Sequence, residues 1–477
     1  ITNDGVTILK EIDVQHPAAK MVVEVAKTQD TECGDGTTTS VILAGELLKQ
    51  SEELINANVH PTVITNGYNM AAAEAVKILD EIAVPADNDE LLTLVASTSL
   101  TGKSVGDDDD QALLSSLIVK AAKFVKDETG RVDTKNIRIT KKVGGVIGDT
   151  YVVNGVVIDK ELVHSRMPKK VENAKIACFS CGLEVKKTEI DAQIQITDPN
   201  MMNDFLAEEE AGMKAMVEKI KSVGANVVYT SKAMDDLVQH YLAKAGIMGY
   251  RRLKESDIEA IAKATGATIA GNVDDLQAAD LGVAECVEEK MVGEDGMSFI
   301  TGCSNPKAVT LFIRGGTEHV IEEVERAIND AVRTVGITLE DGKVVAGAGA
   351  PEIELGLRLQ KFAASVGGRE QLAIEKFAKA MECIPWTLAE NAGLDPIDVI
   401  IKLKHAHSGK DGIYMGINLD SGEADNMKAA NVIEPLRVKT QAVNSATEVA
   451  NMILRIDDVI AARRTNPVPP QGGMPGM

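Results

Sequence analysis

The sequence predicts a multidomain protein that combines mainly helical parts with an α/β part. The chain has 477 residues, which at about 150 residues per domain corresponds to roughly three domains. Helical periodicity dominates both ends, whereas short strand-like runs alternate with helices in the middle. This order predicts that the two helical ends fold together and that the mixed segment is inserted between them.

The first region is predicted to be helical. Pro17 suits the first turn of a helix over 17–27, and an apolar rhythm of helical period runs from Thr37 to Ile55. A further helix is expected after Pro61. The acidic segment Gly102–Asp110 is predicted to be a solvated loop.

The middle region is predicted to be an α/β or α+β domain from about Asp159 to Pro306. The expected strands are Ile137–Ile139, Tyr151–Ile158, Ile176–Phe179, Ile194–Ile196 and Val227–Thr230. The expected helices are Met201–Val223, Met234–Ala245 and Ser256–Thr265.

The last region is predicted to begin with a strand at Val309–Ile313 and then to return to helices. Pro351 and the Asp395-Pro396 pair are typical helix starts. A long helix is expected from about Pro435 to Arg464.

The charge and the cysteine content exclude several classes of protein. Asp and Glu number 72 against 50 Lys and Arg, which gives a net charge of −22. Nucleic-acid binding and docking on an anionic membrane both need clustered basic residues, so neither partner is expected. Six cysteines in so long a chain favour a reducing cytoplasm over a disulfide framework. No membrane span or signal peptide is predicted, and the start at Ile1 predicts further residues before it.

The most unusual short segment lies directly before a predicted helix and consists of Gly34, Asp35, Gly36, Thr37, Thr38 and Thr39. Its glycines allow a tight bend, and the hydroxyls with the first amides of the helix could cradle phosphates. Asp35 beside such a cradle suits Mg²⁺. A plain capped turn is the alternative interpretation.

Two further places could carry chemistry. Gly347-Ala348-Gly349 before a helix is a second possible cradle, with a simple tight turn as the alternative. Asp330 lies in the middle of a predicted helix, next to its apolar stripe, where a carboxylate could orient an attacking water or could be a solvated edge residue. Asp4, followed by Gly5, is interpreted first as part of a turn.

A methionine-rich amphipathic stretch lies within Ile190–Val223. Such surfaces suit binding to varied apolar partners, although an ordinary core-facing stripe has the same pattern.

Several long motifs resemble those of the group II chaperonins, and most nearly those of archaeal thermosome subunits. They are Ile1–Leu9, His16–Lys20, Gly34–Thr39 and Glu434–Gln441, and the resemblance covers essentially the whole chain. The family's Gly-Pro-Lys-Gly-Met-Asp segment is absent before Ile1, and Gly347-Ala348-Gly349 is one glycine short of the family's three-glycine run.

The resemblance implies a chaperonin fold with three domains. The equatorial ATP-binding domain would comprise 1–89 and 347–477, and the intermediate hinge domain 90–157 and 310–346. The apical domain would comprise 158–309, with a helical lid protrusion at about 184–223. Identical or homologous subunits would form two stacked rings of eight or nine around unfolded polypeptides, and ATP binding and hydrolysis would close the lid.

The resemblance also implies roles for individual residues. Asp35 would hold Mg²⁺, and Asp4 and Asp330 would position and activate the attacking water. The nucleotide would be contacted by Gly34, Gly36, Thr37, Thr38, Thr39, Gly347, Gly349, Asn418 and Glu434. Two alternatives remain: a metal-dependent phosphohydrolase of small molecules and a non-hydrolysing scaffold subunit.

Overall fold

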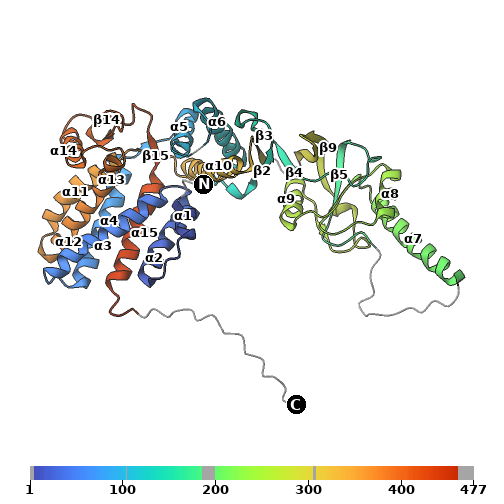
Figure 1. Ribbon diagram of the computed structural model, residues 1–477, viewed down its shortest axis with the longest axis horizontal. Coiled ribbons are helices and arrows are strands. Elements are labelled where there is room, and N and C mark those ends of the chain that lie inside the picture. The colour runs from blue at the N-terminus through green and yellow to red at the C-terminus, as the bar shows by residue number, and fades with distance from the viewer. Residues whose placement is uncertain (1–4, 87, 104, 185–198, 304–307, 460–477) are drawn as a thin grey trace, which may run out of the picture. The chain divides into compact units, whose positions relative to one another are not determined.

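The computed structural model describes residues 5–86, 88–103, 105–184, 199–303 and 308–459 (Figure 1). The chain forms two compact units. One, here called the end unit, consists of Thr2–Pro85 together with Lys343–Met477, and the other, the middle unit, is Ala86–Gly342. The two ends of the chain therefore belong to the same unit. The further division into three domains stays a prediction.

The end unit is mainly helical. Its helices are α1 (Gly5–Glu11), α2 (Pro17–Cys33), α3 (Thr37–Asn56), α4 (Pro61–Ile82), α11 (Ala350–Val366), α12 (Gly368–Met381), α13 (Cys383–Asn391), α14 (Pro396–Ala406) and α15 (Leu436–Leu454). Figure 1 shows α15 beside α2, α3 and α4, so the last helix of the chain packs among the first ones.

Two helices of the end unit begin with the same His-Pro pair. His16 accepts a hydrogen bond from the Ala18 amide through Nδ1 at 3.2 Å, and His60 does the same for Thr62 at 3.2 Å. The following proline occupies the first helical turn, where its missing N–H costs nothing. The sequence prediction of helices after Pro17 and Pro61 is confirmed.

Two small sheets complete the end unit. β12 (Lys343–Ala346) pairs antiparallel with both β1 (Val84–Pro85) and β15 (Ile433–Pro435). β13 (Met415–Ile417) and β14 (Ala424–Asn426) form a separate antiparallel pair. Through β12, the first sheet connects β1 from the first helical region with β15 near the end of the chain.

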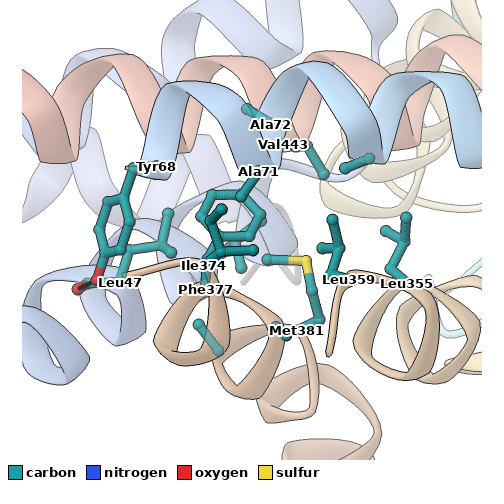
Figure 2. Packing of buried hydrophobic residues seen from close by; sticks show 14 of the residues in the cluster. Leu47, Tyr68, Ala71, Ala72, Leu355, Leu359, Ile374, Phe377, Met381 and Val443 are labelled. Carbon is teal, nitrogen blue, oxygen red and sulfur yellow. Dashed lines mark hydrogen bonds between the residues drawn. The ribbon is translucent and has the colours of Figure 1, made fainter. Parts of the chain in front are cut away.

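The core of the end unit lies between α3, α4, α11, α12 and α15 (Figure 2). The Tyr68 ring meets Phe377 edge-on at 5.5 Å between centroids, and the Tyr68 hydroxyl donates to the Leu47 carbonyl at 2.8 Å. A fully buried tyrosine thus has its polar atom paired. A Cβ on Gly67 would lie 2.5 Å from Ala373 Cβ, so glycine is what allows α4 and α12 to approach so closely.

In the described part of the middle unit the strands form two sheets. Its strands are β2 (Ile137–Val143), β3 (Tyr151–Val153), β4 (Gly155–Ile158), β5 (Lys170–Phe179), β6 (Val227–Thr230), β7 (Met248–Tyr250), β8 (Ile269–Ala270), β9 (Gly282–Val292), β10 (Asp295–Cys303) and β11 (Val309–Gly315). The larger sheet has the order β4-β10-β9-β5-β6-β7, with β8 against β5, and the smaller is β2-β11-β3. The helices are α5 (Asp89–Leu100), α6 (Asp108–Val125), α7 (Pro199–Ser222), α8 (Asp236–Ala245), α9 (Glu255–Thr265) and α10 (Glu318–Asp341).

The larger sheet is covered on both faces. Alternate residues of β5 point to opposite sides, so Ile176 and Cys178 join the cluster with α9, whereas Ala177 and Phe179 join the cluster with α7 and α8. Because both faces are buried there, the second half of β5, Ile176–Phe179, is apolar at every position, which is why the sequence analysis predicts this strand.

The segment Gly102–Asp110 is not wholly a loop, contrary to the sequence prediction. Asp107 caps α6 by accepting from the Asp110 amide at 2.9 Å, and Asp108, Asp109 and Asp110 occupy its first turn. Carboxylates are stabilised there by the unpaired amides at a helix N-terminus. The acidic run is therefore a helix start.

Other predicted boundaries need correction. Tyr151–Ile158 is two strands rather than one, because β3 pairs with β11 and β4 with β10. The β9–β10 hairpin was not predicted, and the last helix ends at Leu454 instead of Arg464. The predicted strand Ile194–Ile196 lies outside the described residues. None of the helices in the described part of the chain is long and apolar enough to cross a membrane.

Candidate functional site

Two glycines shape the turn between α2 and α3. Gly34 ends α2 with φ 71°, and Gly36 precedes α3 with φ 75°. A Cβ on Gly36 would lie 2.7 Å from Val438 Cγ1 and 3.0 Å from Gln29 Nε2, so only glycine fits. The first turn of α3, with Thr37 to Thr39, therefore follows a short loop that passes close to α15.

Asp35 is held in this loop from both sides. Its Oδ1 accepts from the Gly36 amide at 2.7 Å, and its carbonyl accepts from Gln29 Nε2 at 2.9 Å. The same Gln29 nitrogen donates to the Val438 carbonyl of α15 at 3.1 Å. Gln29 is completely buried, and its Oε1 has no partner among the described residues. The sequence analysis did not identify Gln29, because a single glutamine in a helix carries no local signal.

The start of α1 lies against the threonines of α3. A Cβ on Gly5 would lie 2.8 Å from the Thr38 hydroxyl and 3.1 Å from the Thr37 hydroxyl. Gly5 therefore permits a close approach of the first backbone turn to these hydroxyls. Asp4, predicted to act on the attacking water, lies outside the described residues.

A second glycine turn joins β12 to α11. Gly349 has φ 80° and Ala348 has φ 53°, so both residues adopt the left-handed conformation. The pairing of β12 with β15 sets Val345 opposite Glu434. As a result, a Cβ on Gly347 would lie 2.9 Å from Glu434 Oε1. Two predicted site residues from distant parts of the chain thus lie together.

A buried lysine connects this turn to α11. Lys439 Nζ lies 2.7 Å from Glu434 Oε2 and 2.9 Å from Glu352 Oε1, and the lysine side chain is only 7% exposed. Burial alone would lower the pKa of the Lys439 ammonium, but the two carboxylates outweigh burial and raise it well above its usual range. Lys439 is therefore charged, and neither it nor Glu352 was identified from sequence.

The charged side chains beside the second glycine turn are mainly acidic. Burial raises the pKa of the Glu434 carboxyl, and the carboxylates of Glu352 and Asp35 add to this rise while Lys439 opposes it. Two carboxylates, those of Glu352 and Glu434, share the single ammonium of Lys439.

Asn418 lies directly beyond β13, next to the second glycine turn. The Ile417 amide donates to the Ala348 carbonyl at 3.0 Å. Asn418 Oδ1 accepts from the amides of Asp420 and Ser421 at 3.1 and 3.2 Å, so this side chain also shapes its own turn.

Asp330 belongs to the middle unit. It lies within α10, its side chain is 16% exposed, and its Oδ2 accepts from Lys103 Nζ at 2.7 Å. Lys103, between α5 and α6, is only 17% exposed. Asp330 is thus a shielded, ion-paired carboxylate rather than a solvated edge residue. The sequence analysis did not identify Lys103.

Comparison with known proteins decides the family. The family model described as "TCP-1/cpn60 chaperonin family" matches residues 1–464. The chain belongs to this chaperonin family.

Its relatives include two curated archaeal chaperonins. The chain is 57% identical over 482 residues to "Thermosome subunit beta" of Archaeoglobus fulgidus, covering 100% of this chain and 88% of that protein. It is 58% identical over 483 residues to "Thermosome subunit alpha" of Thermoplasma acidophilum, with the same coverage. A solved structure described as the open-state monomer of a group II chaperonin from Methanococcoides burtonii matches with a TM-score of 0.70 and 45% identity, covering 88% of this chain and 100% of that chain.

Membership of the group II chaperonins confirms the predicted fold and function. The chain is an ATP-dependent chaperone subunit that assembles with related subunits into a double-ring chamber. A small-molecule phosphohydrolase is disfavoured because the family match extends over nearly the whole chain.

Proposed function

We propose that this chaperonin subunit hydrolyses ATP with Mg²⁺ at the two glycine turns of the end unit, and that the reaction closes the chamber around unfolded polypeptides. The observation that carries the proposal is the juxtaposition of Gly347 and Glu434, which come from distant parts of the chain. Two glycine-shaped turns that each lead into a helix suit the binding of a phosphate chain.

The residues of the end unit fit a nucleotide and a divalent cation. Positions 36 and 347 have no room for a Cβ, which favours close approach of a ligand to the backbone. We assign phosphate contacts to Gly34, Gly36, Thr37, Thr38 and Thr39, and further nucleotide contacts to Gly347, Gly349, Asn418 and Glu434.

We assign the cation to Asp35, because this carboxylate lies in the glycine-shaped turn that leads into α3. When bound, Mg²⁺ would neutralise charge on the phosphate oxygens. Asp4 and Asp330 are proposed to orient and deprotonate the attacking water. The shielded ion pair with Lys103 supports a functional Asp330 carboxylate, since it holds the carboxylate in a fixed position.

The lid is proposed to be the protrusion at about 184–223. In α7 the buried side chains Met213, Val217 and Ile220 belong to the C-terminal half, whereas residues 207–212 are mainly exposed. A helix anchored at one end suits a protruding element. We further propose that the chain is divided into the equatorial, intermediate and apical domains described above. The subunits are proposed to form rings of eight or nine, and the protein is proposed to be cytoplasmic.

Negative-stain imaging and protease protection of a denatured client test this proposal together. We expect double rings that protect the client when ATP and Mg²⁺ are present. Deleting Met201–Met216 should abolish protection while ATP turnover continues. A monomeric or dimeric particle, or protection unaffected by the deletion, would contradict the proposal.

A further inference from the structure

Gln29, in α2, is a completely buried glutamine whose amide nitrogen contacts two backbone carbonyls. Its Nε2 donates to the Asp35 carbonyl at 2.9 Å and to the Val438 carbonyl at 3.1 Å. The nitrogen carries two N–H groups and a carbonyl can only accept, so these contacts fix which end of the amide faces them. Because an amide does not titrate, the donors and acceptors stay the same at any physiological pH.

These contacts tie the first glycine turn to α15. Val438 lies in the first turn of α15, 409 positions beyond Gln29 in the chain. The packing leaves no spare room, because a Cβ on Gly36 would lie 3.0 Å from Gln29 Nε2 and 2.7 Å from Val438 Cγ1. The next residue of α15, Lys439, pairs with Glu434 at 2.7 Å beside the second glycine turn. One turn of α15 therefore supports both glycine turns.

Asp35 is fixed through both its backbone and its side chain. Gln29 holds its carbonyl, and the Gly36 amide donates to its Oδ1 at 2.7 Å. Its Oδ2 has no hydrogen-bond partner among the described residues, and Asp35 is partly exposed. Carboxylate oxygens are ligands that Mg²⁺ prefers. The turn thus holds one carboxylate oxygen at a set position where a ligand can reach it.

The same amide weakens the fold through its oxygen. Gln29 Oε1 is buried and has no partner in the part of the chain that the structure describes. An unpaired buried oxygen costs stability, whereas an apolar side chain of similar length would avoid that cost. The two donor contacts are therefore what the amide contributes at this position. Such departures from complete hydrogen bonding are typical of functional sites.

We propose that Gln29 is a positioning residue for the divalent cation, because it holds the Asp35 backbone against α15 and so fixes the carboxylate that binds Mg²⁺. This inference rests on the nucleotide site proposed above. Without the two hydrogen bonds the Asp35 backbone gains freedom, and its carboxylate must be ordered again each time the cation binds. Cation binding is then weaker, although Gln29 acts only through Asp35 and needs no contact with the ion.

The test is calorimetric titration of the assembled protein with ADP at a series of Mg²⁺ concentrations. Gln29→Met keeps the length of the side chain and removes both donors. We expect it to raise the Mg²⁺ concentration needed for half-maximal ADP affinity on the order of fivefold, as for one lost hydrogen bond.

The matched control is Gln50→Met in α3. Gln50 is also buried with an unpaired Oε1 among the described residues, but its Nε2 donates to Glu46 of its own helix at 2.7 Å. The control variant loses a buried amide of the same kind without loosening the first glycine turn. It should therefore keep the wild-type Mg²⁺ requirement.

A double-mutant cycle shows whether Gln29 acts through Asp35. In the Asp35→Asn background, Gln29→Met should change the Mg²⁺ requirement less than about twofold, because the carboxylate that Gln29 positions is already gone. Effects that simply multiply in the double variant would overturn the proposal. Gln29→Asn, one methylene too short to reach both carbonyls, replaces Gln29→Met in the cycle if that variant fails to assemble.

The titrations also separate the positioning role from the nucleotide site itself. A wild-type Mg²⁺ requirement in Gln29→Met, or an equal rise in Gln50→Met, would overturn the positioning role alone. A wild-type assembly that binds no ADP, or binds it without dependence on Mg²⁺, would overturn the proposed nucleotide site and this inference with it.

Discussion

Lys439 and Glu434 form a buried ion pair of 2.7 Å beside Gly347. The same ammonium lies 2.9 Å from Glu352, so one lysine compensates two carboxylates. This arrangement makes the lysine a structural requirement of the site.

Replacing Lys439 by Met should destabilise the end unit by about 3–5 kcal/mol, because two buried carboxylates lose their counter-charge. Chemical denaturation measures the loss. The control is Lys402→Met, whose exposed pair with Glu423 should contribute less than about 1 kcal/mol. Equal losses of unfolding free energy in the two variants would show that the buried ion pair stabilises the protein no more than the exposed one.

Ala348→Gly should stabilise the protein. A residue with a Cβ loses about 1–2 kcal/mol of stability in the left-handed conformation that Ala348 adopts, and glycine avoids this loss. Glycine is also more flexible in the unfolded chain, which lowers the stability of the folded protein by about 0.5–1 kcal/mol. The expected net gain is about 0.5–1 kcal/mol in thermal or chemical unfolding. Ala364→Gly, at an exposed position of α11, should instead cost about 1 kcal/mol. A comparable loss at both positions would argue against strain at Ala348.

Asp330→Asn should reduce ATP turnover by about 100-fold or more, the usual contribution of a general base, while ADP affinity stays near the wild-type value. Steady-state phosphate release and ADP titration separate the two effects. Glu322→Gln, in the same helix but 40% exposed, is the matched control and should retain turnover. Unchanged turnover in Asp330→Asn would remove Asp330 from the proposed chemistry.

Asp35→Asn should raise the Mg²⁺ concentration needed for ADP binding by about tenfold or more, since a carboxylate bound to the ion is lost. Titration of Mg²⁺ at fixed ADP measures this. Asp13→Asn, in the exposed segment between α1 and α2, serves as control. If the two variants require the same Mg²⁺ concentration, the cation site lies elsewhere.

Acid should weaken the contact between α11 and α14. Glu354, in α11, lies 2.9 Å from Nδ1 of His407 at the end of α14. Burial would raise the pKa of Glu354, but the contacts with His407 and Arg358 outweigh burial and hold it below its ordinary value of 4.5. The stabilisation is therefore complete above pH 4.5 and is lost as pH falls from there through the lowered pKa. Unfolding free energies measured at decreasing pH should fall more steeply for wild type than for Glu354→Gln. Parallel curves would show that Glu354 does not contribute to the acid sensitivity.

Much of the fold could be predicted because its signals are local. Pro17 and Pro61 begin helices through contacts within two residues, and the apolar run Ile176–Phe179 of β5 stands out from its surroundings. The prediction failed where polar strands alternate, as in β9, and where a run of aspartates served as a helix start instead of a loop.

The sequence by itself determined the family, the two glycine turns and the residues that resemble the nucleotide site, because each is encoded within a few consecutive positions. Only the tertiary structure decided which residues hold these turns. Gln29 reaches Val438, and Lys439 bridges Glu352 and Glu434. These residues matter because they are buried beside partners on other helices and strands. The sequence around an isolated polar residue does not show which distant partner it will contact.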